Sequence, residues 1–362
     1  MKMIKKNTQV FGGVAILLCG DLFQIAPVHG EALFTTASPL FGRFKLHTTI
    51  LTIQHRSDDD AHTANINRSR NISPECNYPF RRVNWKRYKT LSVADVTGEG
   101  LFRGATHLCS NNDERAVLNR VLAEDYGQLH KKQVLRWKRD VPAWVSSIGE
   151  DSTADNLWQV LANHEEFFGL FVEGAPAFLT TNFCVRKKLC NGTPCKMVSI
   201  GYHSESDQIQ YDLAVMSENS PLVMIPRPDY IVVDCEGVGL VPVSLTDTLK
   251  LKLGKVKIEV PAHGVEIGFA CTLHKAQGRT LNKVVLHINP STVLHTASIH
   301  VGMTRVRMAE NLRIFPIPDI THVLNKTWHI GLKTLMNELW SIQMERVAKQ
   351  PCTNRTPNQT NR

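Results

Sequence analysis

The sequence predicts an α/β fold that carries a smaller, β-rich module. The apolar run at residues 14–19 ends at Gly20-Asp21, a pattern typical of a parallel strand buried on both faces of a sheet. Two further apolar runs, at 267–271 and 283–288, are each followed by a segment with helical spacing. Residues 249–260 alternate apolar side chains with charged ones around one glycine, which indicates two strands joined by a turn.

The remaining elements continue this alternation of strands and helices. Residues 106–109 are expected to form a strand, and 112–124 have the spacing of a helix with one apolar side. The charged, tryptophan-rich segment 128–166 has no clear period and is interpreted as an insertion or linker. The other expectations are a polar helix at 58–70, a helix at 296–309, the β-rich module at 193–263 and a disordered polar tail at 348–362.

Composition and charge narrow the class of protein. With 362 residues, of which 43% are hydrophobic and 21% charged, the chain is long enough for two or three domains with a core. A net charge of +9 favours a polyanionic partner, either nucleic acid or an acidic membrane surface. No apolar run approaches the ~20 residues of a membrane-spanning helix. The lysines that precede residues 10–19 imitate a secretory signal, but a buried strand is the better use of that stretch.

Cysteine and histidine spacing indicates an intracellular protein without a structural metal. The nine cysteines form no CxxC pair, and an odd, scattered set is typical of reduced thiols. The fifteen histidines show no HExxH or paired-ligand pattern. We therefore predict no metal site made of protein ligands.

Two segments near the start of the chain can act on a phosphate group. In the GDLFQ segment (residues 20–24), Gly20 permits close approach of the backbone, and the Gln24 amide can donate to a phosphate and accept from water. The alternative is a strand end with a turn. In the Arg56 segment (residues 51–58), Arg56 follows an apolar stretch and fits either an arginine finger, which stabilises charge on a transferring phosphoryl group, or a surface ion-pair partner.

Two later segments add polar groups at the ends of strands. The HKAQG segment (residues 270–281) runs from an apolar strand into one helical turn rich in phosphate-capable donors, and Gly278 can adopt the left-handed conformation that ends the turn. A plain polar connection explains so many donors less well. In the GMTR segment (residues 300–307), Arg305 and Arg307 are two residues apart, so they point to different faces of a helix and cannot share one role.

In this order, the four segments resemble motifs III, IV, V and VI of superfamily-1B helicases of the RecD/Pif type. Residues 107–112 with Asn119 resemble the strand and helix that open the second motor domain of that family. Residues 174–179 with 191–193 resemble the segment that leads into its SH3-like insertion. The resemblance implies a RecA-like motor with a P-loop NTPase fold: the end of the first domain at 1–50, a connecting region at 51–105, the second domain at 106–192 and 264–325, and the SH3-like insertion at 193–263.

The resemblance also implies roles for matched residues. Gln24 would sense the γ-phosphate of ATP, beside Gly20 and Asp21, and Arg56 and Arg305 would be two arginine fingers. Gln277 and Gly278 would lie where nucleotide and DNA meet. Thr272, His274 and Lys275 would contact the backbone of single-stranded DNA. His300 and Gly302 depart from the tyrosine and alanine of the family pattern, and Ser57 from its glutamine.

The family pattern also requires a phosphate-binding loop, G-x-x-x-x-G-K-[S/T], and an acidic motif that holds Mg²⁺ with ATP. The only Gly-Lys in the sequence is Gly254-Lys255, which is followed by valine inside the predicted strand pair. The only Asp-Glu is Asp113-Glu114, in a polar helix start. We therefore expect the chain to begin after the acidic motif and to lack ATPase activity by itself.

The resemblance leaves three interpretations open. The first is an ATP-dependent 5′-to-3′ DNA helicase with roles in repair, recombination and telomere maintenance, in the nucleus or mitochondrion of a eukaryote, present as a truncated chain. The second is a relic that binds DNA or a partner helicase without hydrolysis. The third is a mobile-element helicase of the same family. Retention of Gln24, Arg56, Gln277 and Arg305 favours the first interpretation over the relic.

Two basic stretches lie outside these segments. Residues 80–89 interleave five cations with three aromatic side chains, as proteins that bind single-stranded nucleic acid do. If this stretch binds DNA, Trp85 and Tyr88 would stack on bases; the alternative is a solvated basic loop. The run Arg186-Lys187-Lys188 is interpreted as solvated.

Overall fold

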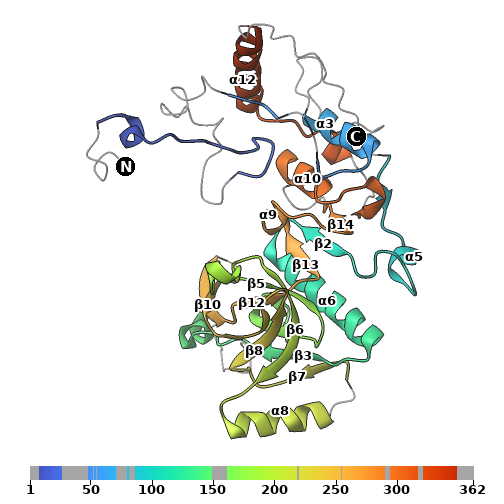
Figure 1. Cartoon of the computed structure of the whole chain (residues 1–362). Helices are drawn as coiled ribbons and strands as arrows, with labels where there is room; N and C mark the ends of the chain where they lie inside the picture. Colours follow the sequence, from blue (N-terminus) through green and yellow to red (C-terminus); the bar gives the residue numbers. More distant parts are fainter. Residues whose placement is uncertain are drawn as a thin grey trace, which may run out of the picture.

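A computed structural model describes most of the chain and confirms the α/β class (Figure 1). The described residues are 8–26, 48–51, 53, 55–70, 80, 86–148, 161–217, 220–253, 255–289, 294–316 and 321–348. Trp85 and the predicted tail beyond residue 348 lie outside them. Within the described part, no helix is long and apolar enough to cross a membrane, and no group of three or more histidine, cysteine or acidic side chains is placed to hold a metal ion.

The central element is a parallel sheet of five strands, in the order β1-β15-β14-β2-β13. Its inner strands are buried on both faces, as helices packed on either side of a parallel sheet require. The strands are β1 (Lys89–Thr90), β2 (Thr106–Cys109), β13 (Ala270–Thr272), β14 (Val284–His287) and β15 (Leu312–Phe315). The helices between them are α6 (Asn112–His130), α9 (Leu273–Ala276) and α10 (Thr296–Met303).

Helix α6 fixes the edge strand β13 through one side chain. Asn111 caps the helix by accepting a hydrogen bond from the Glu114 amide at 2.8 Å, and Lys131 ends it in a left-handed conformation. Two turns into the helix, Asn119 accepts from the Ala270 amide at 2.7 Å and donates to the Ala270 carbonyl at 3.2 Å. The start of the HKAQG segment is therefore held at both of its backbone groups.

The β-rich part is larger than the predicted module. Its main sheet has the order β12-β5-β6-β8-β9 and is antiparallel throughout. Because β5 and β12 lie outside 193–263, the expected limits of the module are too narrow, and its likeness to an SH3 fold stays a prediction. The strands are β5 (Pro176–Leu179), β6 (Pro194–Gly201), β8 (Tyr230–Cys235), β9 (Gly239–Ser244) and β12 (Val265–Ile267).

The segment interpreted as an insertion or linker, 128–166, contributes regular structure instead. Helix α6 continues through its first residues, and β3 (Val134–Lys138) then pairs with β4 (Phe168–Phe171) and β7 (Leu222–Met224) in a second small sheet. Helix α8 (Glu205–Ser217), which the alternation of residues does not predict, lies on the outer end of this half of the molecule (Figure 1). The expected hairpin is confirmed as β10 (Asp247–Leu253) and β11 (Val256–Ala262).

The strand predicted at 267–271 is two strands that belong to different sheets. β12 pairs with β5 of the antiparallel sheet, and β13 pairs with β2 of the parallel sheet. Gly268 stands between them, where an added Cβ would lie 2.6 Å from the ring of Phe178. The chain therefore crosses from one half of the molecule to the other within two residues, directly before the HKAQG segment.

The buried strand predicted at 14–19 is wrong. Residues 14–20 form no helix or strand and pair with no strand among the described residues, and Leu17 and Leu18 are 86% and 67% exposed. A parallel strand becomes buried only when strands on both edges and helices on both faces cover it. The apolar composition predicts a buried strand, but the strands and helices that would cover it are not among the described residues.

Helix α10 ends at Met303 rather than 309, so Arg305 and Arg307 follow the helix. Helix α3 (Asp60–Arg70) confirms the predicted polar helix. Helix α12 (Ile330–Ala348) has no counterpart among the sequence-based expectations. Shorter helices are η1 (Val10–Gly13), α5 (Val93–Val96), η3 (Ala143–Ile148), η4 (Glu165–Phe167), η5 (Val185–Lys187), η6 (Ala309–Asn311) and α11 (Thr321–Leu324).

Candidate nucleotide and DNA site

The GDLFQ segment is fastened to the parallel-sheet domain by Phe23. This side chain is 4% exposed and meets Trp328 edge-on, with ring centroids 5.1 Å apart. The guanidinium carbon of Arg70 lies 5.0 Å from the Phe23 ring, which adds a cation–π contact. Segments more than three hundred residues apart in the sequence therefore meet at this point.

Asp21 and Gln24 lie together beside a cation. Asp21 accepts from Arg70 Nη2 at 2.7 Å and from Gln24 Nε2 at 3.2 Å. Gln24 is half-buried, and its amide is held by a carboxylate of its own segment. Gly20 is exposed, and nothing lies within 4 Å of the Cβ that it lacks, so its backbone is open to approach by a ligand.

Arg56 joins three of the four segments. Its Nε donates to Thr280 Oγ1 of the HKAQG segment at 3.1 Å, and its Nη1 donates to the Thr304 carbonyl of the GMTR segment at 3.0 Å. The side chain is half-buried. These two partners, a hydroxyl and a carbonyl, place Arg56 where the HKAQG and GMTR segments meet.

Arg305 occupies a different environment from the one an arginine finger needs. It is 1% exposed, and all three guanidinium nitrogens donate to protein oxygens, on Val301, Ala276, Arg279 and Thr304. Burial, and then the neighbouring Arg56, lower the pKa of Arg305 to about 10, so it stays a cation at neutral pH. In this structure Arg305 ties the HKAQG segment to the GMTR segment, and contact with a phosphate requires it to leave those carbonyls.

Arg307, in contrast to Arg305, is exposed to solvent. Its side chain is 64% exposed and lies 3.8 Å from the Asp58 carboxylate. Arg305 and Arg307 therefore lie in different environments, one buried and one exposed, although both follow the helix rather than lie on two of its faces. The neighbouring carbonyl of Arg307 accepts from the Ser57 hydroxyl at 2.6 Å, so the serine that replaces the family's glutamine makes a structural bond.

The two departures in helix α10 are explained by packing. His300 is 2% exposed and its Nδ1 lies 2.9 Å from Ser69 Oγ, while its ring faces Phe23 and Trp328. Burial, and then Arg70, lower the pKa of His300 to about 3, so this histidine is neutral. At Gly302, an added Cβ would lie 2.6 Å from Leu286 Cδ1, which explains why the family's alanine is absent.

The HKAQG segment presents a short exposed turn between two fixed ends. Thr272 caps helix α9 by accepting from the Lys275 amide at 3.5 Å and is 8% exposed. Its hydroxyl therefore serves the helix, which leaves His274 and Lys275 as the exposed side chains of the turn. Gly278 has φ +85°, which confirms the predicted left-handed position.

Lys275 already has a partner on the β-rich side. Its Nζ lies 3.0 Å from Glu266 Oε2, and the same carboxylate oxygen is bonded to Arg115 of helix α6. Burial alone would raise the pKa of Glu266, but Arg115, Lys275 and Arg139 lower it to about 2. Glu266 therefore remains an anion and connects β12, α6 and α9 in one ion-pair network.

The interpretation of residues 80–89 as a stacking platform is wrong for Tyr88. Tyr88 is 4% exposed, and its hydroxyl lies 3.1 Å from His62 Nδ1. Burial raises the pKa of this phenol, and the ring belongs to the core beneath the parallel sheet. Phe80 is buried in the same core, so these two aromatic side chains serve packing rather than a nucleic-acid surface.

Sequence reasoning missed several residues of this site. The sequence pattern assigns no role to Arg70, although a cation ten residues into a helix that follows Arg56 is a usable signal. Arg115 and Glu266 carry no local signal, because their pairing joins residues 151 positions apart. Trp328 precedes a helix that no pattern predicted, so its contact with Phe23 was not foreseeable.

The parallel sheet, with the segments placed at its edge, has the arrangement of a RecA-like fold. Among solved structures, the chain is similar to Pif1 helicase from Bacteroides in complex with ADP-AlF3 and ssDNA, with a TM-score of 0.58, 16% identity, and coverage of 94% of this chain and 70% of that one. It is also similar to Pif1 helicase from Candida albicans, with a TM-score of 0.54, 17% identity and coverage of 93% and 72%. No protein-family model matches the chain.

Comparison of the sequence finds relatives with the same name as these structures. The human ATP-dependent DNA helicase PIF1 is 22% identical over 320 residues, and the Xenopus laevis PIF1 is 23% identical over 317. Each alignment covers 86% of this chain and 42% of the relative, so the chain spans less than half the length of the curated relatives it matches. The chain is therefore similar in fold to Pif1 helicases and similar in sequence, at 22–23% identity, to ATP-dependent DNA helicases named PIF1.

Proposed function

We propose that this chain is the nucleotide-coupling and DNA-gripping part of an ATP-dependent DNA helicase that moves 5′ to 3′. The observation that carries the proposal is the convergence of the four segments. Arg56 bonds to both the HKAQG and GMTR segments, and the GDLFQ segment docks beside them through Phe23. A change of charge at one segment therefore affects the others through these contacts. A helicase needs such a connection between the nucleotide phosphate and the DNA along which it moves.

The residues present fit the phosphate groups of a nucleotide better than they fit its metal ion. Arg56 and Gln24 are half-buried groups next to an open glycine backbone, a combination that suits a phosphoryl oxygen. Among the described residues, however, no cluster of acidic or histidine side chains is placed to hold Mg²⁺, and Asp21 is paired with Arg70. We assign these residues to the phosphate side of the site and assign them no role in binding the metal.

Arg56 is the proposed arginine finger, and Arg305 its support. Arg305 holds the Ala276 and Arg279 carbonyls, and its neighbour Thr304 offers the carbonyl on which Arg56 rests. A second finger role for Arg305 remains a prediction that requires its guanidinium to turn outward. His274 and Lys275 are the proposed contacts to the backbone of single-stranded DNA, with Gln277 and Gly278 at the junction.

In the cell, the family activity would serve DNA repair, recombination and telomere maintenance, in the nucleus or mitochondrion of a eukaryote. The alternative is a relic that grips DNA or a partner helicase without turnover. The same chain carried by a mobile element would bear the same site.

The purified chain is expected to bind single-stranded DNA in a salt-dependent manner without DNA-stimulated ATP hydrolysis. The exposed cations of the site contact phosphates, while the 362 residues contain no Gly-Lys-Ser or Gly-Lys-Thr loop. Fluorescence anisotropy of a labelled thymidine oligonucleotide across a salt series, together with a phosphate-release assay, checks both halves. Absence of salt-dependent binding would contradict the proposed contacts to DNA. Robust ATP turnover would contradict the expectation that the chain does not hydrolyse ATP by itself.

A further inference from the structure

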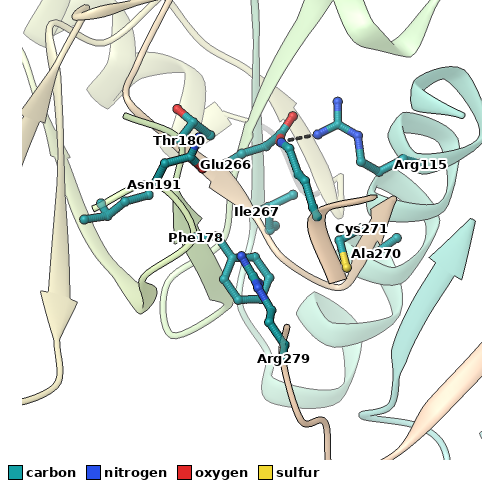
Figure 2. Close-up of a pocket in the computed structure, with 11 residues that line it drawn as sticks. Arg115, Phe178, Thr180, Asn191, Glu266, Ile267, Ala270, Cys271 and Arg279 are labelled. Atoms are coloured by element: carbon teal, nitrogen blue, oxygen red, sulfur yellow. Dashed lines mark hydrogen bonds and ion pairs between the residues drawn. The ribbon is translucent and has the colours of Figure 1, made fainter. Parts of the chain in front are cut away.

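A small hollow lies where the HKAQG segment meets the β-rich half of the molecule (Figure 2). It lies between α6, β5, β12 and the turn after β13, and its empty space of about 300 Å³ includes open solvent rather than an enclosed cavity. Its charged side chains are three cations and one carboxylate, so the lining has a net positive charge. These side chains are Arg115, Lys275, Arg279 and Glu266.

Arg279 is held in this hollow with an unused donor. Its guanidinium carbon lies 4.1 Å from the centroid of the Phe178 ring, and Figure 2 shows the two groups stacked. Gly192 makes room for it, because an added Cβ would lie 2.8 Å from Arg279 Nη2. Nη1 is buried and has no hydrogen-bond partner among the described residues.

Arg115 provides a second unused donor on the opposite wall. Its side chain is only 9% exposed, and one of its terminal nitrogens is bonded to Glu266. Its Nε is buried without a partner in the described part of the chain. A buried guanidinium donor without a partner is destabilising, so two of them around one hollow indicate a missing acceptor.

The chemistry of the missing acceptor follows from the lining. Two guanidinium groups that line one hollow and each keep an unused donor suit an anion with several oxygens, as a phosphate group has. A nucleobase is disfavoured, because Arg279 already covers a face of Phe178 on which a base would stack. The hollow also adjoins helix α9, whose exposed His274 and Lys275 are the proposed contacts to single-stranded DNA.

We propose that this hollow binds one phosphodiester group of single-stranded DNA, with Arg279 Nη1 and Arg115 Nε as donors. Lys275 joins them by moving from Glu266 to the same phosphate. The inference rests on the proposed grip of the chain on DNA and extends it by one contact on the β-rich side. Because the Arg279 carbonyl accepts from Arg305 at 3.1 Å, a ligand here also bears on the link to the GMTR segment.

The test is Arg279→Met in the full chain, with Arg186→Met as the matched control, since Arg186 is an exposed cation on η5. Loss of one phosphate contact should weaken binding of a thymidine oligonucleotide about tenfold at low salt. It should also make the salt dependence shallower by about 0.7 in log–log slope. Arg186→Met should change neither quantity. Arg279→Lys, which keeps the charge but loses the planar stack, should fall between wild type and Arg279→Met, and thermal unfolding of each variant verifies the fold.

A neutral methylphosphonate moved through the oligonucleotide locates the contact. At one linkage the substitution should weaken binding by the wild-type chain and leave the Arg279→Met chain unaffected. Equal sensitivity of both chains at every linkage would overturn the inference while leaving the proposed grip intact. Binding of inorganic phosphate alone, with DNA affinity unchanged in the variant, would also overturn it. A wild-type chain that binds no DNA at all would instead refute the proposed function, and this inference with it.

Discussion

Arg305→Ala is expected to lower the free energy of unfolding by about 3–5 kcal/mol, the largest effect of any single substitution at this site. The side chain makes four hydrogen bonds and is 1% exposed. Each bond from a charged donor contributes about 1.5–3 kcal/mol, and removing the cation relieves part of its desolvation cost, so the net loss is smaller than the sum. The carbonyl of Arg279 would lose its donor.

The consequence for function follows from where those carbonyls lie. Two of them, on Ala276 and Arg279, belong to the HKAQG segment, which is the proposed DNA contact. Loosening that turn should weaken DNA binding even at temperatures where the variant is folded. This would be a positioning effect, because Arg305 has no exposed surface to offer a ligand.

Urea unfolding followed by circular dichroism measures the loss, with Arg307→Ala as control. Arg307 is the same residue type two positions away, but it is 64% exposed and its partner Asp58 is 3.8 Å distant. A surface pair of this kind contributes about 0–1 kcal/mol. If the two alanine variants unfold within about 1 kcal/mol of each other, the structural role of Arg305 is wrong.

The second large effect is a loss of stability between pH 7 and pH 5. Five described histidines are almost fully buried, and burial is the main cause that lowers the pKa of each, His62 among them. The pKa values of the other four are about 3 for His107, about 4 for His263, about 4 for His287 and about 3 for His300. In the unfolded chain a histidine titrates near 6.5, so the unfolded state binds protons first as the pH falls.

The direction and size of the pH effect on stability follow from these pKa values. Stability is complete above pH 6.5 and is lost as the pH falls below it, at up to about 1.4 kcal/mol per pH unit for each histidine. By pH 5 each contributes a loss of up to about 2 kcal/mol, and four together approach the whole stability of a typical domain, about 5–15 kcal/mol. Glu266 acts later, because its lowered pKa of about 2 removes stability only below its usual pKa of 4.5.

Urea titrations at half-unit steps from pH 8 to pH 4.5 check this expectation. His300→Phe should make the fall of the unfolding free energy with pH less steep. It removes one buried proton acceptor while keeping a ring beside Phe23 and Trp328. His55→Gln, at an exposed position, should leave the slope unchanged. A stability that stays constant from pH 7 to pH 5 would show that these histidines are not held neutral by the fold.

The sequence predicted best those elements whose pattern is local. The alternation of leucine and lysine located the β10–β11 hairpin, and the apolar runs located β2 and β14 almost to the residue. Gly278 was predicted in the left-handed region and has φ +85°. In each case the signal and the structure lie within one short segment.

The sequence-based predictions failed where the burial of a residue depends on partners that are distant in the sequence. Residues 14–19 have the composition of a buried strand, but no described strand lies beside them, so Leu17 and Leu18 are exposed. Tyr88 reads as part of a basic, aromatic surface until His62 and the sheet enclose it. The apolar run at 267–271 looked continuous because composition does not reveal which sheet each residue joins.

The candidate site was half foreseeable for the same reason. Arg56, Gln24 and the HKAQG segment carry their chemistry in consecutive residues and are found together. The burial of Arg305, the Lys275–Glu266–Arg115 network and the stack of Arg279 on Phe178 depend on tertiary contacts. Family resemblance supplies a role for Arg305, while the structure supplies its surroundings, and the two differ.

The central claim is that single-stranded DNA lies along helix α9 and the adjoining hollow. Photo-crosslinking of a 4-thiothymidine oligonucleotide to the chain, followed by mass spectrometry of the linked peptides, tests it most directly. We expect crosslinks in peptides that contain residues 274–280 and 178–193, and we expect them to weaken as salt is raised. Crosslinks confined to helix α8 or helix α12, with none at these two segments, would contradict the placement of the DNA.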